Sequence, residues 1–148
     1  MSISELEHPQ STRPGSYQGP VRYHTGMSFE NSLQLRVVRK HRDGVTVSFP
    51  LEAGFLNGNG VLHGGVIAAI ADEAAWHALV HAHQGHREMT TTELKVNYLR
   101  PIAGKKVLAR ACVLRAGKTL SVTRVDLMDA ERRLSAIAIV TYMLLPAK

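Results

Sequence analysis

Hydrophobic positions change their spacing along the chain, and this change predicts where strands give way to a helix. Apolar residues mostly alternate with polar ones over residues 33–38 and again over 45–49, on either side of an Asp43-Gly44 turn. Alternation with a period of two places every second side chain on the same face of a strand. The two segments therefore predict a β-hairpin, which Pro50 ends.

The longest apolar segment has helical spacing and predicts one long helix over residues 64–84, with Gly85 as its stop. Apolar residues cover most of its circumference, so we expect other elements to enclose the helix. One acid, Asp72, interrupts a run of alanine and aliphatic residues. Because an unpaired buried carboxylate is costly, this residue requires a partner or a function.

Four more alternating segments follow the helix and predict four strands. They lie at residues 89–99, 106–115, 119–128 and 134–144, with short turns between them. Consecutive strands joined by short turns are expected to pair as an antiparallel meander. A hairpin, one long helix and a meander predict an α+β fold, in which a curved antiparallel sheet wraps around the central helix.

Length and composition are those of one such domain. Of the 148 residues, 45% are hydrophobic and 20% are charged, which is typical of a single domain with a core. Residues 1–25 are rich in Ser, Pro, Gly and Gln and are expected to form a flexible leader, so the domain is assigned to residues 26–148. A single cysteine, no membrane-spanning segment and no signal-peptide core favour a cytoplasmic protein.

The charge of the chain narrows the choice of ligand. Lys and Arg number 18 against 12 Asp and Glu, a formal charge of +6, which attracts an acidic ligand such as nucleic acid, a membrane surface or a phosphorylated cofactor. Aromatic residues make up only 5%, and no Lys- or Arg-rich tract of the nucleic-acid type occurs. We therefore expect neither nucleic acid nor a membrane as partner.

A glycine-rich polar loop leads directly into the long helix. Residues 57–65 read Asn-Gly-Asn-Gly-Val-Leu-His-Gly-Gly. The first N–H groups of a helix have no intrahelical partner and the helix dipole is positive there, so this junction can hold negative charge. We interpret Asp72 as the chemical group of a site and the loop as its oxyanion partner.

A set of five residues in this region indicates a function more specifically than any one of them does alone. They are Asn57, Gly60, His63, Gly64 and Asp72. The spacing Asn-x-x-Gly-x-x-His-Gly-Gly, with an acid nine positions after the histidine, resembles the acyl-CoA thioesterases of the hotdog fold, in particular the phenylacetate-degradation type. The resemblance covers about residues 29–145. It implies a sheet-around-helix architecture and a homodimer or homotetramer, the family leaning towards four chains, with active sites between subunits.

The resemblance also implies a role for each of these residues. Gly64 would donate its backbone N–H to the thioester carbonyl. Asp72 of the other subunit would act as general base on water or as nucleophile on the carbonyl carbon. Asn57 would hold the water or the thioester, and His63 would position the loop or polarise the carbonyl.

Two of these positions leave alternatives open. The family commonly has a hydroxyl beside the attacking water, which falls at Thr91, although a threonine on either side leaves the register undecided. Glu73 is a rival to Asp72, but neighbours on a helix point about 100° apart, so both cannot face one site equally well. The spacing from the histidine favours Asp72.

The resemblance gives the positive charge a reason. CoA is part of the substrate, so no separate cofactor is implied, and its phosphates would lie near the turns after the first and second strands of the second half. Six residues of these turns are expected to bind CoA: Tyr98, Arg100, Pro101, Arg115, Gly117 and Lys118. Basic side chains there would bind phosphate oxygens through charge-assisted hydrogen bonds.

A metal site and two other functions are alternatives to this interpretation. Glu73, His77 and His81 have a spacing that could hold a metal, but no fourth ligand is evident, so no metal is expected. A hotdog dehydratase or hydratase often carries His-Phe-Pro near this loop. Here His63 is followed by two glycines, which counts against a dehydratase or hydratase. A non-catalytic acyl-CoA binding module would not need Asp72. The expected activity is hydrolysis of aryl- or medium-chain acyl-CoA to the free acid and CoA.

Overall fold

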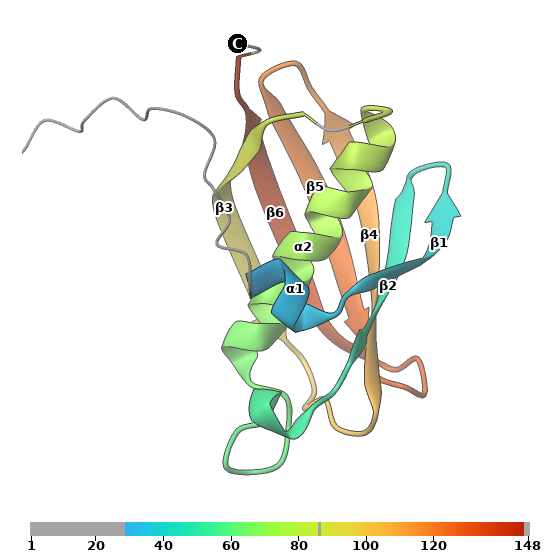
Figure 1. Ribbon diagram of the computed structural model, residues 1–148, viewed down its shortest axis with the longest axis vertical. Helices are drawn as coiled ribbons and strands as arrows, with labels where there is room; N and C mark the ends of the chain where they lie inside the picture. Colours follow the sequence, from blue (N-terminus) through green and yellow to red (C-terminus); the bar gives the residue numbers. More distant parts are fainter. Residues whose placement is uncertain (1–28, 86, 147–148) are drawn as a thin grey trace, which may run out of the picture.

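The computed structural model describes residues 29–85 and 87–146 and shows one long helix laid against a curved sheet (Figure 1). The elements in chain order are α1 (Phe29–Leu33), β1 (Arg36–His41), β2 (Gly44–Pro50), a 3-10 turn (Ala53–Phe55), α2 (Gly64–Ala82), β3 (Met89–Tyr98), β4 (Lys106–Ala116), β5 (Leu120–Met128) and β6 (Leu134–Leu144). The predicted α+β architecture is confirmed. The expected leader at residues 1–25 lies outside the described residues.

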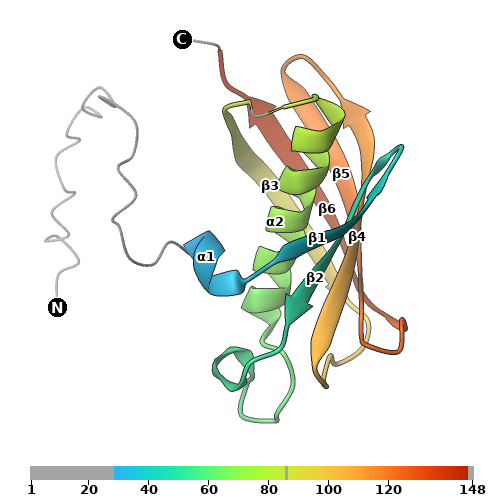
Figure 2. The same cartoon turned by 45° about the vertical axis from the view of Figure 1, so that its right-hand side comes forward.

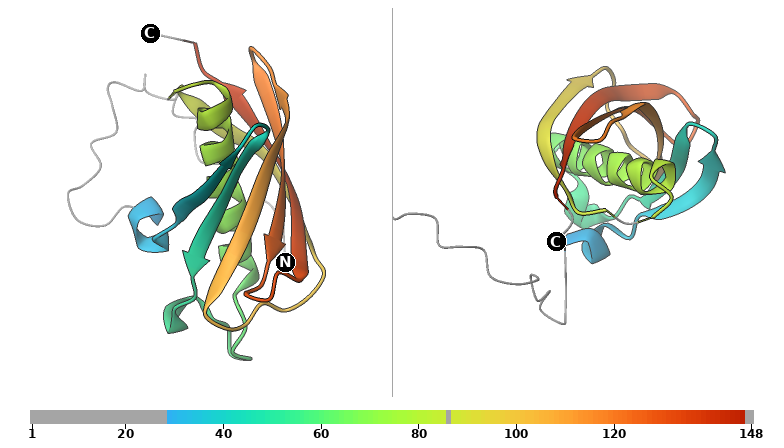
Figure 3. Two further views of the ribbon diagram at one scale, coloured as in Figure 1. Left: turned by 90° about the vertical axis from the view of Figure 1, so that its right-hand side faces the viewer. Right: turned by 90° about the horizontal axis from the view of Figure 1, so that it is seen from above.

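Helix α2 lies along the concave side of the sheet (Figures 2 and 3). Viewed from above, the strands curve around the helix (Figure 3). Seven of its residues are buried: Ile67, Ile70, Ala71, Ala74, Ala75, Ala78 and Leu79. Since four of them are alanines, the helix backbone can lie close to β2, β4 and β5. No helix in the described part of the chain is long and apolar enough to cross a membrane.

Two predicted boundaries shift, each for a local backbone reason. The first strand begins at Arg36, because Phe29–Leu33 forms a short helix that ends where Gln34 takes a left-handed φ of 48°. Helix α2 ends at Ala82, two residues before the predicted end, because Gln84 also has a positive φ of 56°.

The predicted meander is wrong for one strand. The six strands are ordered β1-β2-β4-β5-β6-β3, so β3 pairs with β6 and not with β4. Seven residues join β3 to β4. An extended segment of that length reaches about 23 Å, whereas three strand spacings amount to about 14 Å. The connection can therefore cross the ends of β6 and β5, and it leaves β3 at an edge of the sheet.

The β1–β2 turn is held to β4 through Asp43. The Cys112 thiol donates a hydrogen bond of 3.0 Å to one Asp43 oxygen, and Arg110 pairs with the other. These two donors lower the pKa of Asp43 from its ordinary 3.8 to about 2. The charged carboxylate is therefore the form that the folded turn favours.

We expect the Asp43 contacts to make folding stability depend on acid pH. A carboxyl with a lowered pKa contributes stability above its ordinary pKa, and this contribution is lost as the pH falls through the lowered value. Between about pH 4 and about pH 2, the native Tm should therefore fall more steeply than that of Asp43→Asn. Cys112→Ser, which keeps a donor, should retain the native slope, whereas Cys112→Ala should lose part of it. Parallel Tm curves for all four proteins would contradict this expectation.

Candidate active site

The loop before α2 brings Asn57 close to the start of the helix. The Asn57 side-chain oxygen accepts hydrogen bonds from the backbone N–H of Asn59 at 2.9 Å and of Val61 at 3.4 Å. Gly60, with a φ of 73°, allows the turn between them. Because the oxygen is used within the loop, the Asn57 amide nitrogen is the group left to donate to a ligand. It has no hydrogen-bond partner among the residues that the structure describes.

His63 caps the helix. Its Nδ1 accepts a hydrogen bond of 3.0 Å from the backbone N–H of Gly65. Since Nδ1 accepts, Nε2 carries the proton in the neutral ring. The Gly64 N–H, by contrast, has no partner within residues 29–85 and 87–146. The positive end of α2 therefore presents one free N–H, at the residue predicted to donate to an oxyanion.

Tyr98 ties the end of β3 to this helix start. Its hydroxyl donates a hydrogen bond of 2.8 Å to the Gly64 carbonyl oxygen. A Cβ atom at position 64 would lie 3.4 Å from the Tyr98 ring, so the ring covers one side of the glycine. Tyr98 was predicted to bind CoA, and the structure places it beside the predicted oxyanion donor.

Asp72 lies about two turns further along α2, half-buried, where two hydroxyl groups reach its carboxylate. Thr91 of β3 donates to Oδ1 at 2.9 Å and is 3.2 Å from Oδ2. Tyr142 of β6 donates to Oδ1 at 2.7 Å. Thr91 is thus the threonine that contacts Asp72, whereas the Thr92 hydroxyl donates to the Thr141 carbonyl, beside a bulge in β3.

Tyr142 is the residue that the sequence analysis missed. It is only 5% exposed, and burial raises its pKa, with the Asp72 carboxylate adding to the increase. The phenol therefore stays protonated and able to donate. Tyr142 lies directly opposite Thr91 in the β3–β6 register. That pairing would have identified it, but the predicted meander placed β3 beside β4.

Gly64 and Asp72 of one chain cannot serve the same reacting atom. Eight positions of helix separate them, which is about 12 Å along the axis at the usual rise. A group that accepts a hydrogen bond from the Gly64 N–H therefore lies beyond the reach of Asp72 in the same chain.

The residues predicted to bind CoA form two separate groups within the chain. Arg100 and Pro101 follow β3, at the end of the sheet where α2 starts, whereas Arg115, Gly117 and Lys118 lie at the other end (Figure 1). The eleven residues of β4 lie between the two turns, a separation of about 33 Å. Gly117 is explained by its own turn, because a Cβ atom there would lie 2.2 Å from the Leu120 carbonyl oxygen.

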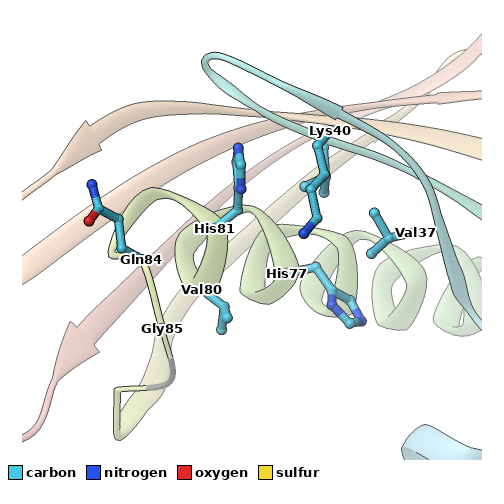
Figure 4. Close-up of a pocket in the computed structure, with 8 residues that line it drawn as sticks. Val37, Lys40, His77, Val80, His81, Gln84 and Gly85 are labelled. Atoms are coloured by element: carbon cyan, nitrogen blue, oxygen red, sulfur yellow. The ribbon is translucent and has the colours of Figure 1, made fainter.

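A hollow of about 430 Å³ lies between the C-terminal half of α2 and the β1–β2 hairpin (Figure 4). Its lining residues are Val37, Lys40, Val45, His77, Val80, His81, Gln84 and Gly85, and none of them is a predicted catalytic or CoA-binding residue. His81 donates from Nε2 to the His41 carbonyl at 2.9 Å, and burial lowers the pKa of His77. Among the described residues, no group of three or more His, Cys, Asp or Glu side chains could hold a metal ion.

Comparison with known proteins identifies the family. Residues 59–136, which include the helix start and Asp72, match the thioesterase superfamily. The medium/long-chain acyl-CoA thioesterase YigI of Escherichia coli K12 is 33% identical over 137 residues, covering 82% of this chain and 86% of YigI.

Solved structures with the same fold include two of low sequence identity. The thioesterase HI1161 of Haemophilus influenzae superposes with a TM-score of 0.72 at 24% identity, covering 78% of this chain and 80% of that one. The PaaI protein of the E. coli phenylacetic acid degradation operon gives a TM-score of 0.70 at 21% identity, over 80% of this chain and 84% of that one. The latter supports the fold and not the phenylacetate subtype. The hotdog fold and the thioester hydrolase class are confirmed, and the chain belongs to the thioesterase superfamily.

Proposed function

We propose that the protein hydrolyses acyl-CoA thioesters to a free acid and CoA. The observation that carries this proposal is the Asp72 carboxylate, half-buried and held by two hydroxyl groups, on a helix whose first N–H is free. The likeness to YigI favours a medium- or long-chain acyl group over an aryl group. A fatty acyl chain is thus the first substrate to test.

The free groups at the start of α2 would stabilise the negative charge that develops on the thioester oxygen. The Gly64 N–H points along the helix dipole, and the Asn57 amide nitrogen is a second donor in the same loop. Donors already in place cost no reorganisation when the oxyanion forms. The loop itself is anchored, because the Leu62 N–H donates to the Ile102 carbonyl at 2.8 Å.

Asp72 would supply the base or the nucleophile. As a base it takes a proton from water while the water oxygen attacks the carbonyl carbon. The C–S bond then breaks, the thiolate of CoA leaves, and the acyl group is released as the acid. A thiolate is a good leaving group, so one carboxylate and one oxyanion donor are sufficient.

A second copy of the chain would complete the site. Within the described part of the chain, strand β3 is hydrogen-bonded on one side only, to β6, and its other edge presents unpaired backbone groups. Pairing two β3 edges about a two-fold axis would run the strands antiparallel and set opposite ends of the two chains side by side. Asp72, beside Thr91 of β3, would then approach Gly64 of the other copy.

The same arrangement would bring together the two groups of residues that are predicted to bind CoA. The turn that carries Arg115, Gly117 and Lys118 would lie at the end of the assembly where the other copy places Arg100. Each CoA would then contact basic residues of two chains. This accounts for a positive charge spread over both ends of the sheet.

We expect Asp72→Asn to lower kcat by about a hundredfold or more, because general bases contribute a factor of that size. The assay is thiol release from acyl-CoAs of graded chain length and from phenylacetyl-CoA, with kcat/KM expected to be highest for a medium or long chain. Glu73→Gln is the matched control for the neighbouring carboxylate. An Asp72→Asn protein as fast as native, with loss in Glu73→Gln instead, would reverse the assignment. Binding without thiol release by the native protein would indicate a non-catalytic module.

A mixing experiment tests the two-chain site. Asn57→Asp keeps the side-chain oxygen that holds the loop, removes the donor amide and places a negative charge beside the developing oxyanion, so it disables the half of the site that stabilises the oxyanion. Mixed and re-associated in equal amounts, Asp72→Asn and Asn57→Asp should recover about one quarter of native activity, since half of the dimers are mixed and each contains one intact site. Activity that stays at the level of the separate variants, or a fully active monomer in sedimentation, would exclude a shared site.

His63 is expected to act by positioning the loop, because its side chain hydrogen-bonds the Gly65 N–H and no other group in the described part of the structure. His63→Ala should lower the free energy of unfolding by about 1 kcal/mol through loss of the cap. His63→Asn, which restores a capping oxygen, should recover both stability and most of kcat. An Asn variant with native stability and low kcat would instead assign the Nε2 proton to polarisation of the carbonyl.

A further inference from the structure

We propose that Tyr142 is a positioning residue that fixes the Asp72 carboxylate so that Oδ2 is the oxygen presented to the reaction. This inference rests on the proposed function, in which Asp72 is the base or nucleophile. It adds a buried strand residue outside the loop-and-helix pattern to the machinery of the site.

The two oxygens of Asp72 are not equivalent. Oδ1 accepts from Tyr142 at 2.7 Å and from Thr91 at 2.9 Å, whereas among the described residues Oδ2 has only the longer contact with Thr91, at 3.2 Å. A carboxylate oxygen has two lone pairs for such contacts. Oδ1 is therefore saturated, and Oδ2 keeps a lone pair for a water molecule or a carbonyl carbon.

Tyr142 is the rigid member of this network. It lies on β6, between β5 and β3, and is 5% exposed, whereas Thr91 is exposed on the edge strand. Its hydroxyl is also 3.0 Å from the Asp72 backbone carbonyl. The phenol thus contacts the side chain and the main chain of the same residue, and links the sheet to the middle of α2.

Such a link matters because the rate of attack depends steeply on geometry. A reacting group displaced by about 1 Å can lose a factor of about a hundred in rate. Without the Tyr142 hydroxyl, the exposed Thr91 would be the only described side chain that holds the carboxylate. It could then rotate about its side-chain bonds and present either oxygen.

We expect Tyr142→Phe to lower kcat by about tenfold to a hundredfold, the usual worth of a hydrogen bond to a charged group, with KM within about threefold of native. The matched control is Thr123→Val. It also removes a buried hydroxyl from a central strand, but one without a hydrogen-bond partner in the described part of the structure. This control should keep native kcat. Thermal melts establish that both variants are folded.

The double variant separates positioning from a general structural effect. In the Asp72→Asn background, Tyr142→Phe should change the residual rate by less than about twofold, because the group that it positions is no longer a carboxylate. A folded Tyr142→Phe with native kcat, a change confined to KM, or the same loss of kcat in both backgrounds would overturn the proposal. Native activity in Asp72→Asn alone would instead overturn the proposed function.

A variant at Thr91 tests the same network should Tyr142→Phe not fold. Thr91 is exposed, so Thr91→Val should leave the fold intact. With Tyr142 holding Oδ1, its loss of kcat should stay below about tenfold. A loss as large as that of Asp72→Asn would show that the threonine alone orients the carboxylate, and would overturn the role of Tyr142.

Discussion

The carboxylate of Asp72 is the constraint on which the arrangement of this domain depends. A charged group placed in an apolar helix costs stability unless hydrogen bonds satisfy it. The partners are hydroxyl groups from β3 and β6, which are far apart in the sequence and adjacent in the sheet. Placing β3 beside β6, and not beside β4, therefore gives the helix its polar contacts at one edge while the other strands cover its apolar side.

Much of the fold was accessible from the sequence because alternation and helical spacing are local signals. They identified the hairpin strands, the central helix and the four later strands, with ends that differ by a few residues at most. Which strands are neighbours is a non-local property, and alternation along β3 is compatible with either neighbour. The short connections favoured the simplest pairing, which the structure replaces with a crossover.

The candidate site likewise contains residues that a local sequence pattern indicates and one that it does not. Asn57, His63 and Gly64 are close in sequence, and loop and helix geometry places them together, so their spacing was informative. Tyr142 comes from the last strand and meets Asp72 only through strand pairing, so no local pattern indicated it. The sequence analysis assigned the turns after β3 and β4 to one CoA site because both turns follow strands. Successive turns of an antiparallel sheet, however, lie at opposite ends of the sheet.

Strand β3 has a further consequence, since it contacts α2 at both of its ends. Thr91, near its start, meets Asp72, and Tyr98, at its last position, meets the carbonyl of Gly64. The length of this strand therefore sets the distance between its two contacts with the helix. A bulge between Thr91 and Glu93 keeps the Thr91 and Tyr98 side chains on the same inner face. Replacing its outward side chains would leave both contacts in place. Inserting or deleting a single residue between positions 92 and 97 would shift one contact against the other, so this strand should tolerate changes of composition but not of length.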